Sequence, residues 1–368
     1  MINGNRVKQA RELCGWTQKE LAARVGIKQP TLAQIENGIG SASARIVQSV
    51  AELTDFQEEF FERPDTVEFS LGSLLFRAHA AATARQRTEA YRHAQLMFEI
   101  HQRLAVDVTT LPVQIPKLRE DAITAARIAR VELGISPDKP IPYLVNSAER
   151  NGAVVLAIPV ELEKRDAFSL WAGDERKAPV IAVSSGKPGD RTHWNMAHEL
   201  GHLVLHNPAE GILKDLDRDA DRFAAEFLMP ETAMREEISN PVTLENIARL
   251  KLRWKVAMQA LIRRAFELKI VTERQYRYLF EQIIWNGWRT KEPVSVPTEK
   301  PRALRKMAEE VYGDPIDFRQ MSKDTGVGLT RLRQIIAAHA EKPNRPAPSA
   351  PPSTGRLLEF SRKKERFG

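Results

Sequence analysis

Apolar residues recur every three or four positions in the first 55 residues, the spacing that gathers side chains on one face of a helix. This pattern predicts four short helices, over residues 6–13, 18–25 and 29–36 and around 46–50. Gly26 stands between the second and third helices, and glycine suits the left-handed conformation that ends a helix. Two short helices joined by a tight glycine turn predict a helix-turn-helix.

Local signals agree with this prediction. Thr17 precedes the second helix and Glu20 follows three residues later, which is the capping-box pattern of a helix start. The helix after the glycine turn would then lie in the major groove of DNA. The expected contacts are to base edges from Gln29, Thr31 and Gln34, and to phosphates from Gln18, Lys19 and Lys28. A small helical domain that binds another protein is the alternative.

A longer helical pattern follows over residues 77–106, and Pro112 and Pro116 come after it. The arginines of this segment predict a solvated helix face, with contact to DNA as the alternative. We assign residues 1–62 to the helix-turn-helix domain and residues 63–116 to a helical connector.

After the connector the pattern changes, because short apolar runs join the helical segments. Residues 153–158, 167–171 and 179–184 predict buried strands. They precede a helical apolar stripe within residues 191–206, so a small sheet comes before a helix. We therefore predict an α+β domain with a helical extension over residues 117–292, in a chain that is otherwise mainly α.

The helix over residues 191–206 carries the sequence HELGH. His198 and His202 lie four positions apart and share one helix face, where two imidazoles can bind the same metal ion. Glu199 lies beside them, where a carboxylate can take a proton from metal-bound water. This is the H-E-x-x-H pattern of zinc hydrolases, and Gly201 leaves room between the two ligands. The alternative is an amphipathic helix with two surface histidines.

The third metal ligand should come from the helix predicted next along the chain. Asp217 is our first choice and Asp219 is the competing choice, because both flank the buried stripe of that helix. Asp221 could bind a ligating histidine from behind, and so could His206. Glu226 points away and is expected to be solvated. The alternative is that these acidic residues bind no metal and only stabilise the N-terminus of their helix, where negative charge interacts favourably with the helix dipole.

The C-terminal third is helical, and a proline-containing linker lies near residues 293–301. Beyond it, residues 321–335 match residues 21–35, which lie 300 positions earlier. We interpret residues 293–340 as a helical unit that is a second, degenerate helix-turn-helix; a helical hairpin packed on the preceding domain is the alternative. Residues 341–368 combine a Pro, Ala and Ser-rich stretch with a basic end, which predicts a disordered tail.

Composition sets further limits. The chain has 368 residues, enough for two or three domains, and 42% of them are hydrophobic. Cys14 is the one cysteine, which excludes an internal disulfide and fits a reducing cytoplasm. The sequence shows neither the apolar segment of a signal peptide nor a run of membrane-spanning length. We therefore expect a cytoplasmic protein with no membrane partner, and its net charge of +7 is compatible with nucleic acid.

Three stretches resemble known families. TQKELAARVGIKQPTLAQIENG resembles the XRE-type helix-turn-helix family, and AHELGHLVLH and DRDADRFAAEFLMP together resemble the ImmA/IrrE metallopeptidase family. The second resemblance implies Zn²⁺, a zincin-like α+β fold, and cleavage or control of transcriptional repressors. The family motif usually reads E-x-E-A where this chain has DRDA, so each carboxylate here is one methylene shorter.

These observations predict a DNA-binding transcription regulator with a zinc metallopeptidase domain. The expected partners are double-stranded operator DNA, bound by a homodimer, and a repressor protein as the substrate. The expected site consists of the base Glu199 and the metal ligands His198, His202 and Asp217. One alternative is a regulator whose peptidase-like domain senses a ligand or partner without cleaving. Another is an antitoxin-type or stress-response assembly factor.

Overall fold

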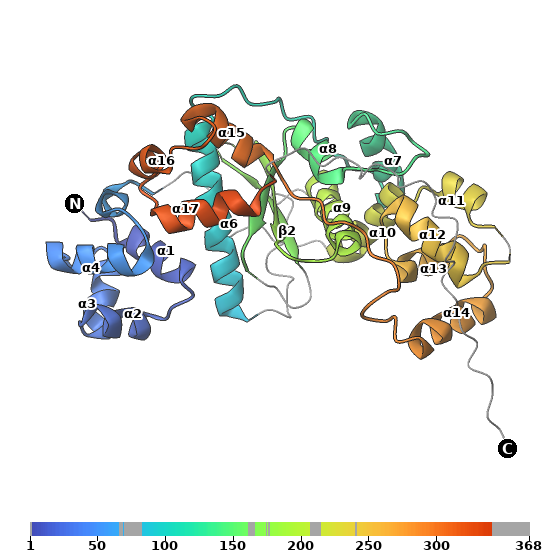
Figure 1. The fold of residues 1–368 in the computed structure, drawn as a ribbon, viewed down its shortest axis with the longest axis horizontal. Helices are drawn as coiled ribbons and strands as arrows, with labels where there is room; N and C mark the ends of the chain where they lie inside the picture. Colours follow the sequence, from blue (N-terminus) through green and yellow to red (C-terminus); the bar gives the residue numbers. More distant parts are fainter. Residues whose placement is uncertain are drawn as a thin grey trace, which may run out of the picture.

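The computed structural model describes residues 2–65, 69, 83–160, 166–173, 175, 177–206, 215–239 and 241–340 (Figure 1). Helices dominate this part of the chain and surround one three-stranded sheet. The expected fold class, mainly α with an α+β metal domain and an all-α N-terminal domain, is confirmed. The tail predicted over residues 341–368 lies outside the described residues. None of the described helices is both long and apolar enough to span a bilayer.

The N-terminal domain consists of α1 (Gly4–Leu13), α2 (Gln18–Val25), α3 (Gln29–Glu36), α4 (Ala44–Thr54) and the 3₁₀ helix η1 (Glu58–Glu62). The helices α2 and α3 cover the residues that the sequence pattern predicted. Thr17 accepts the backbone N–H of Glu20, and the Glu20 carboxylate accepts the backbone N–H of Thr17, which completes the capping box. Gly26 ends α2 with a φ of 77°, in the left-handed region that favours glycine.

The sheet contains β1 (Val154–Ile158), β2 (Ala167–Ala172) and β3 (Ala178–Ser184) in the order β1-β3-β2. Strand β3 lies between a parallel partner, β1, and an antiparallel partner, β2. Side chains alternate between the two faces of a strand, and both faces of this sheet are covered. Val155 and Ile181 enter one hydrophobic core, whereas Val154 and Val180 enter another.

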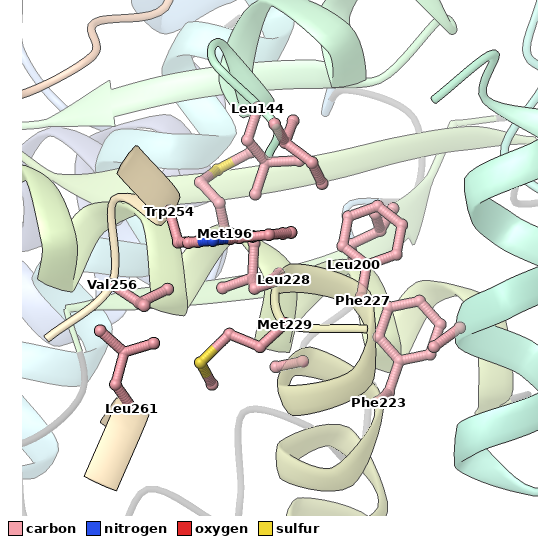
Figure 2. Packing of buried hydrophobic residues seen from close by; sticks show 14 of the residues in the cluster. Leu144, Met196, Leu200, Phe223, Phe227, Leu228, Met229, Trp254, Val256 and Leu261 are labelled. Carbon is pink, nitrogen blue, oxygen red and sulfur yellow. The ribbon is translucent and has the colours of Figure 1, made fainter. Parts of the chain in front are cut away.

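The first core joins the sheet to helices on the metal-domain side. These are α7 (Ala122–Glu132), α8 (Leu144–Arg150), α9 (Gly189–Leu205), α10 (Leu216–Leu228), α11 (Glu231–Glu237), α12 (Leu244–Trp254), α13 (Met258–Glu267) and α14 (Glu273–Trp285). Figure 2 shows Trp254 of α12, Met196 of α9 and Phe227 of α10 in the same packed cluster. This packing fixes α10 and the later helices against α9.

The second core joins the other face of the sheet to the N-terminal domain, to α6 (Ala84–Leu104), and to α15 (Ala303–Tyr312), α16 (Phe318–Thr325) and α17 (Leu329–Ala338). The first residues of the helix predicted over residues 77–106 lie outside the described part. In Figure 1, α15–α17 lie beside α6 and the N-terminal domain, far from α11–α14. The chain therefore crosses the molecule between α14 and α15.

Candidate metal centre

The helices α9 and α10 pack side by side, with Gly201 of α9 against Phe223 of α10. A Cβ atom on Gly201 would lie 2.9 Å from Cδ1 of Phe223, closer than such atoms approach. Gly201 therefore makes room for the Phe223 ring, a contact that the sequence did not predict. This contact sets the spacing between the helix that carries the histidines and the helix that carries the aspartates.

Gly201→Ala should destabilise the chain, although alanine is the better helix former by about 1 kcal/mol. The added Cβ forces Phe223 or all of α10 to move, and overpacking of this kind costs about 1–3 kcal/mol. Urea unfolding should show a lower midpoint, and Zn²⁺ should bind more weakly because Asp217 moves with α10. Adding Phe223→Leu, which frees volume at the contact, should recover part of the loss. If the loss of stability in the double variant equalled the sum of the losses in the two single variants, a direct collision between residue 201 and Phe223 would be contradicted.

Three side chains gather where α9 faces the start of α10: His198, His202 and Asp217. The Nε2 atoms of the two histidines are 3.1 Å apart. Asp217 Oδ1 lies 4.0 Å from His198 Nε2 and 3.5 Å from His202 Nε2. Ligand atoms around a tetrahedral Zn²⁺ with bonds of about 2.0–2.1 Å are about 3.3 Å apart. Two of the three separations are close to this value and the third, between Asp217 and His198, is longer, so these residues could hold a Zn²⁺ ion.

The opposite nitrogens of both imidazoles are held by neighbours. His198 Nδ1 lies 2.8 Å from Asp221 Oδ1, and His202 Nδ1 lies 2.8 Å from His206 Nδ1. Burial lowers the pKa of His206 to about 3, so its ring is neutral and its Nδ1 can accept a hydrogen bond from His202 Nδ1. With both Nδ1 atoms donating outward, the two Nε2 lone pairs face each other. That arrangement is favourable when a cation lies between them.

The acidic residues of α10 have different surroundings. Of the described acidic residues, Asp217 joins the group of donor atoms and Asp219 does not. Glu226, which the sequence predicted to be solvated, is buried and forms ion pairs with Arg264 and Arg127. That prediction is wrong because helix periodicity gives the direction of a side chain but not the neighbours that α7 and α13 place there.

Glu199 follows His198 in α9, is buried, and has a partner that sequence reasoning missed. Ser169 Oγ of β2 donates to Glu199 Oε2 at 2.7 Å and lies 3.1 Å from the Glu199 carbonyl oxygen. Ser169 is the one polar residue in the strand sequence AFSLWA, and a buried hydroxyl needs a partner. That isolated polar position is the signal that could have identified it.

A cleft of about 1330 Å³ opens beside this group. Its walls come from α7, α9, α10, α11, α13 and α14. Asp217 and Asp221 form one part of the lining, and Trp194 of α9 forms another. Arg218 and Arg222 extend the same wall along α10. Asp217, one of the three residues that supply donor atoms, therefore lines this cleft.

The expected DNA-reading surface lies on α2 and α3. Five of its six predicted residues are exposed: Lys19, Lys28, Gln29, Thr31 and Gln34. Gln18 is half-buried, and its amide donates to Glu36 and accepts from Gln29. In this structure Gln18 therefore supports the first residue of α3 and does not project freely.

Comparison with family models identifies two regions of the chain. Residues 7–61 match the model described as Helix-turn-helix, and residues 148–266 match the model described as IrrE N-terminal-like domain. The second region includes β1–β3, α9 and α10, and thus both helices that supply the metal-binding group. A comparison with curated proteins returned no match.

Proposed function

We propose that this chain, which joins an XRE-type helix-turn-helix domain to an IrrE-like domain, is a DNA-binding transcription regulator. Its second domain would be a Zn²⁺-dependent peptidase that cleaves a repressor protein. The observation that carries this proposal is the group His198, His202 and Asp217, which could hold a metal ion. Glu199, the residue after His198, is buried and would be the base. The test is the purified chain itself, which should carry one Zn²⁺ and cleave an unfolded protein only while that ion is bound. A chain that binds no Zn²⁺ would contradict the proposal.

Bound Zn²⁺ would polarise the scissile carbonyl and lower the pKa of water at the site. His198, His202 and Asp217 would hold the ion, while the Nδ1 contacts fix both rings. Glu199 Oε1 would accept the proton of the attacking water and pass it to the leaving amine. Ser169 would orient that carboxylate through its bond to Oε2.

Strand β2 provides a place for an extended substrate. It lies on the side of Glu199, as the contact with Ser169 shows, and among the described strands it pairs with β3 alone. An extended segment can add to such an edge through main-chain hydrogen bonds, while pockets receive its side chains. The substrate would then be an unfolded stretch, such as an exposed linker of a repressor.

Operator DNA would be bound by a homodimer through α3. Lys19→Ala and Lys28→Ala should each weaken binding to any duplex and lower the slope of log K against log salt by about one, because each lysine would neutralise one phosphate. Fluorescence anisotropy over a KCl series measures this slope. Lys306→Ala, at an exposed position of α15, is the matched control. Slopes that stay equal to the wild-type value would contradict contact of these lysines with phosphates.

A second candidate function is a regulator whose IrrE-like domain binds metal and senses a partner without cleaving. The replacement of the glutamates of the E-x-E-A motif by the shorter Asp217 and Asp219 favours it. Stoichiometric Zn²⁺ without cleavage of any unfolded protein would support this function.

A further inference from the structure

Residues 318–338 form a second pair of helices, α16 and α17, that repeats the local fold of α2 and α3. The turn between the helices uses the same left-handed glycine, with φ of 72° at Gly326 and 77° at Gly26. The buried apolar positions also repeat, in the pairs Leu21 and Met321, Leu32 and Leu332, and Ile35 and Ile335. The match between residues 21–35 and 321–335 therefore reflects a repeated structure.

Most of the positions that are predicted to meet DNA are not repeated. Of the six predicted contacts in the first pair, two keep their character, as Arg319 and Gln334. The other four, Gln18, Lys28, Gln29 and Thr31, correspond to Phe318, Gly328, Leu329 and Arg331. Phosphate contacts need hydrogen-bond donors or cations, and base contacts need polar groups. Phe318, Gly328 and Leu329 have no polar side-chain group and could make neither kind of contact through their side chains.

The N-terminus of α17 meets the end of α4. The Asp55 carboxylate accepts the backbone N–H of Arg331 at 2.6 Å, and the Asp55 carbonyl accepts the N–H of Gly328 at 2.9 Å. Phe56 pairs with Val327 in an isolated antiparallel bridge. A Cβ on Gly328 would overlap Asp55, so this approach requires glycine.

The Arg331 side chain strengthens the same contact. Its guanidinium donates to the carbonyl of Thr54 at 2.8 Å and lies 5.1 Å from the centroid of the Phe56 ring. Arg63, which follows η1, donates to the carbonyl of Asp324 at 3.0 Å. The residue that takes the place of the base-reading Thr31 is therefore engaged with the N-terminal domain.

The C-terminal unit α15–α17 and the residues that flank it also form hydrogen bonds with the metal domain. His339 Nε2 accepts the backbone N–H of Ala157 in β1 at 3.5 Å. Glu149 of α8 accepts the backbone N–H groups of Arg302 and Ala303, both at 2.9 Å, at the start of α15. The helices α15 and α17 also pack on β1. One unit thus contacts both domains.

We infer that α15–α17 form an intramolecular clamp between the two domains and not a second DNA-binding unit. The N-terminus of α17, where a recognition helix would meet DNA, binds the Asp55 carboxylate instead. A helix N-terminus attracts anions, and Asp55 supplies the negative charge that a phosphate would otherwise bring. The clamp joins the end of α4 to β1 and α8 of the metal domain. The part of the inference that concerns DNA rests on the proposed function, whereas the part that concerns the clamp does not.

Amide hydrogen exchange of the full-length chain tests the clamp. Gly328→Ala should raise the exchange rates of the Gln57 and Arg331 amides at least about 10-fold, because both amides bond across the contact. Thr330→Ala, at an exposed position of the same helix, should leave them unchanged. Asp55→Asn, which tolerates a left-handed backbone but lacks the charge, should raise them too and serves if Gly328→Ala fails to fold. Unchanged rates in both variants would overturn the clamp.

DNA-binding measurements test the inference that α16 and α17 do not bind DNA. Arg319→Ala and Arg333→Ala remove exposed cations from α16 and α17. With a mixed-sequence duplex, both variants should keep the wild-type salt slope, whereas Lys28→Ala should lower it by about one. A decrease of about one in either arginine variant would show that this unit binds DNA. If the wild-type chain binds no duplex, the helix-turn-helix function fails and the exchange experiment alone decides on the clamp.

Discussion

Glu199→Gln should reduce cleavage of an unfolded protein by about 10²–10⁴-fold while one Zn²⁺ remains bound. Glutamine has nearly the shape of glutamate, but its amide cannot take the proton of the attacking water. The metal should stay because Glu199 lies outside the group of donor atoms formed by His198, His202 and Asp217. Fluorescently labelled casein reports the cleavage rate, and elemental analysis reports the metal content of the same sample.

Glu132→Gln is the matched control, because Glu132 is exposed at the end of α7 and is not among the residues that line the cleft. It should cleave at close to the wild-type rate. Ser169→Ala should lie between the two, since it leaves the Glu199 carboxylate in place and removes the hydroxyl that orients it. A Glu199→Gln chain that cleaves like the wild type would rule out the base. A wild-type chain with bound Zn²⁺ and no cleavage would favour the non-cleaving sensor.

Asp217→Asn should weaken Zn²⁺ binding by more than about 100-fold, because losing a residue that only supports a ligand already costs about 10–100-fold. Asp221→Asn should fall within that smaller range, since Asp221 orients His198 and does not join the donor atoms. Asp219→Asn should bind Zn²⁺ nearly as tightly as the wild type. Competition with a chromophoric chelator measures all three affinities.

The order of the three affinities is the decisive result. The neighbouring aspartates have similar charge and belong to one helix, so a general electrostatic effect would weaken binding about equally in all three variants. Only a direct ligand gives one large loss beside one negligible loss. A loss at Asp219 that exceeds the loss at Asp217 would assign the third ligand to the competing residue and require α10 to turn about its axis.

The close approach of α9 and α10 compensates for the short side chain of Asp217. Aspartate reaches less far than the glutamate of the E-x-E-A motif, so α10 must lie close to α9 for Oδ1 to approach the two imidazoles. Gly201 permits that approach, because the Phe223 ring occupies the space that a side chain would fill. The Gly201→Ala variant therefore probes the metal centre as well as the packing of the two helices.

Several features of this protein follow from local sequence alone. The bounds of α2 and α3 depend on the Thr17 capping box and on Gly26, and both signals act within a few residues. The shared face of His198 and His202 follows from a spacing of four in a helix. The three strands follow from short apolar runs that are buried on both faces. Such features depend on neighbours in the sequence, so the chain reveals them without a fold.

Other features were decided by the tertiary structure. Periodicity within α10 leaves Asp217 and Asp219 as competing ligands, and only the approach of α9 brings Asp217 to the histidines. Burial of Glu226 depends on Arg264, which lies 38 positions later in the chain. The sequence match that ends at Ile335 shows a repeated helix pair, but its contact with Asp55 crosses 276 positions. A helix fixes the direction of its own side chains, whereas what they meet depends on distant segments that packing brings together.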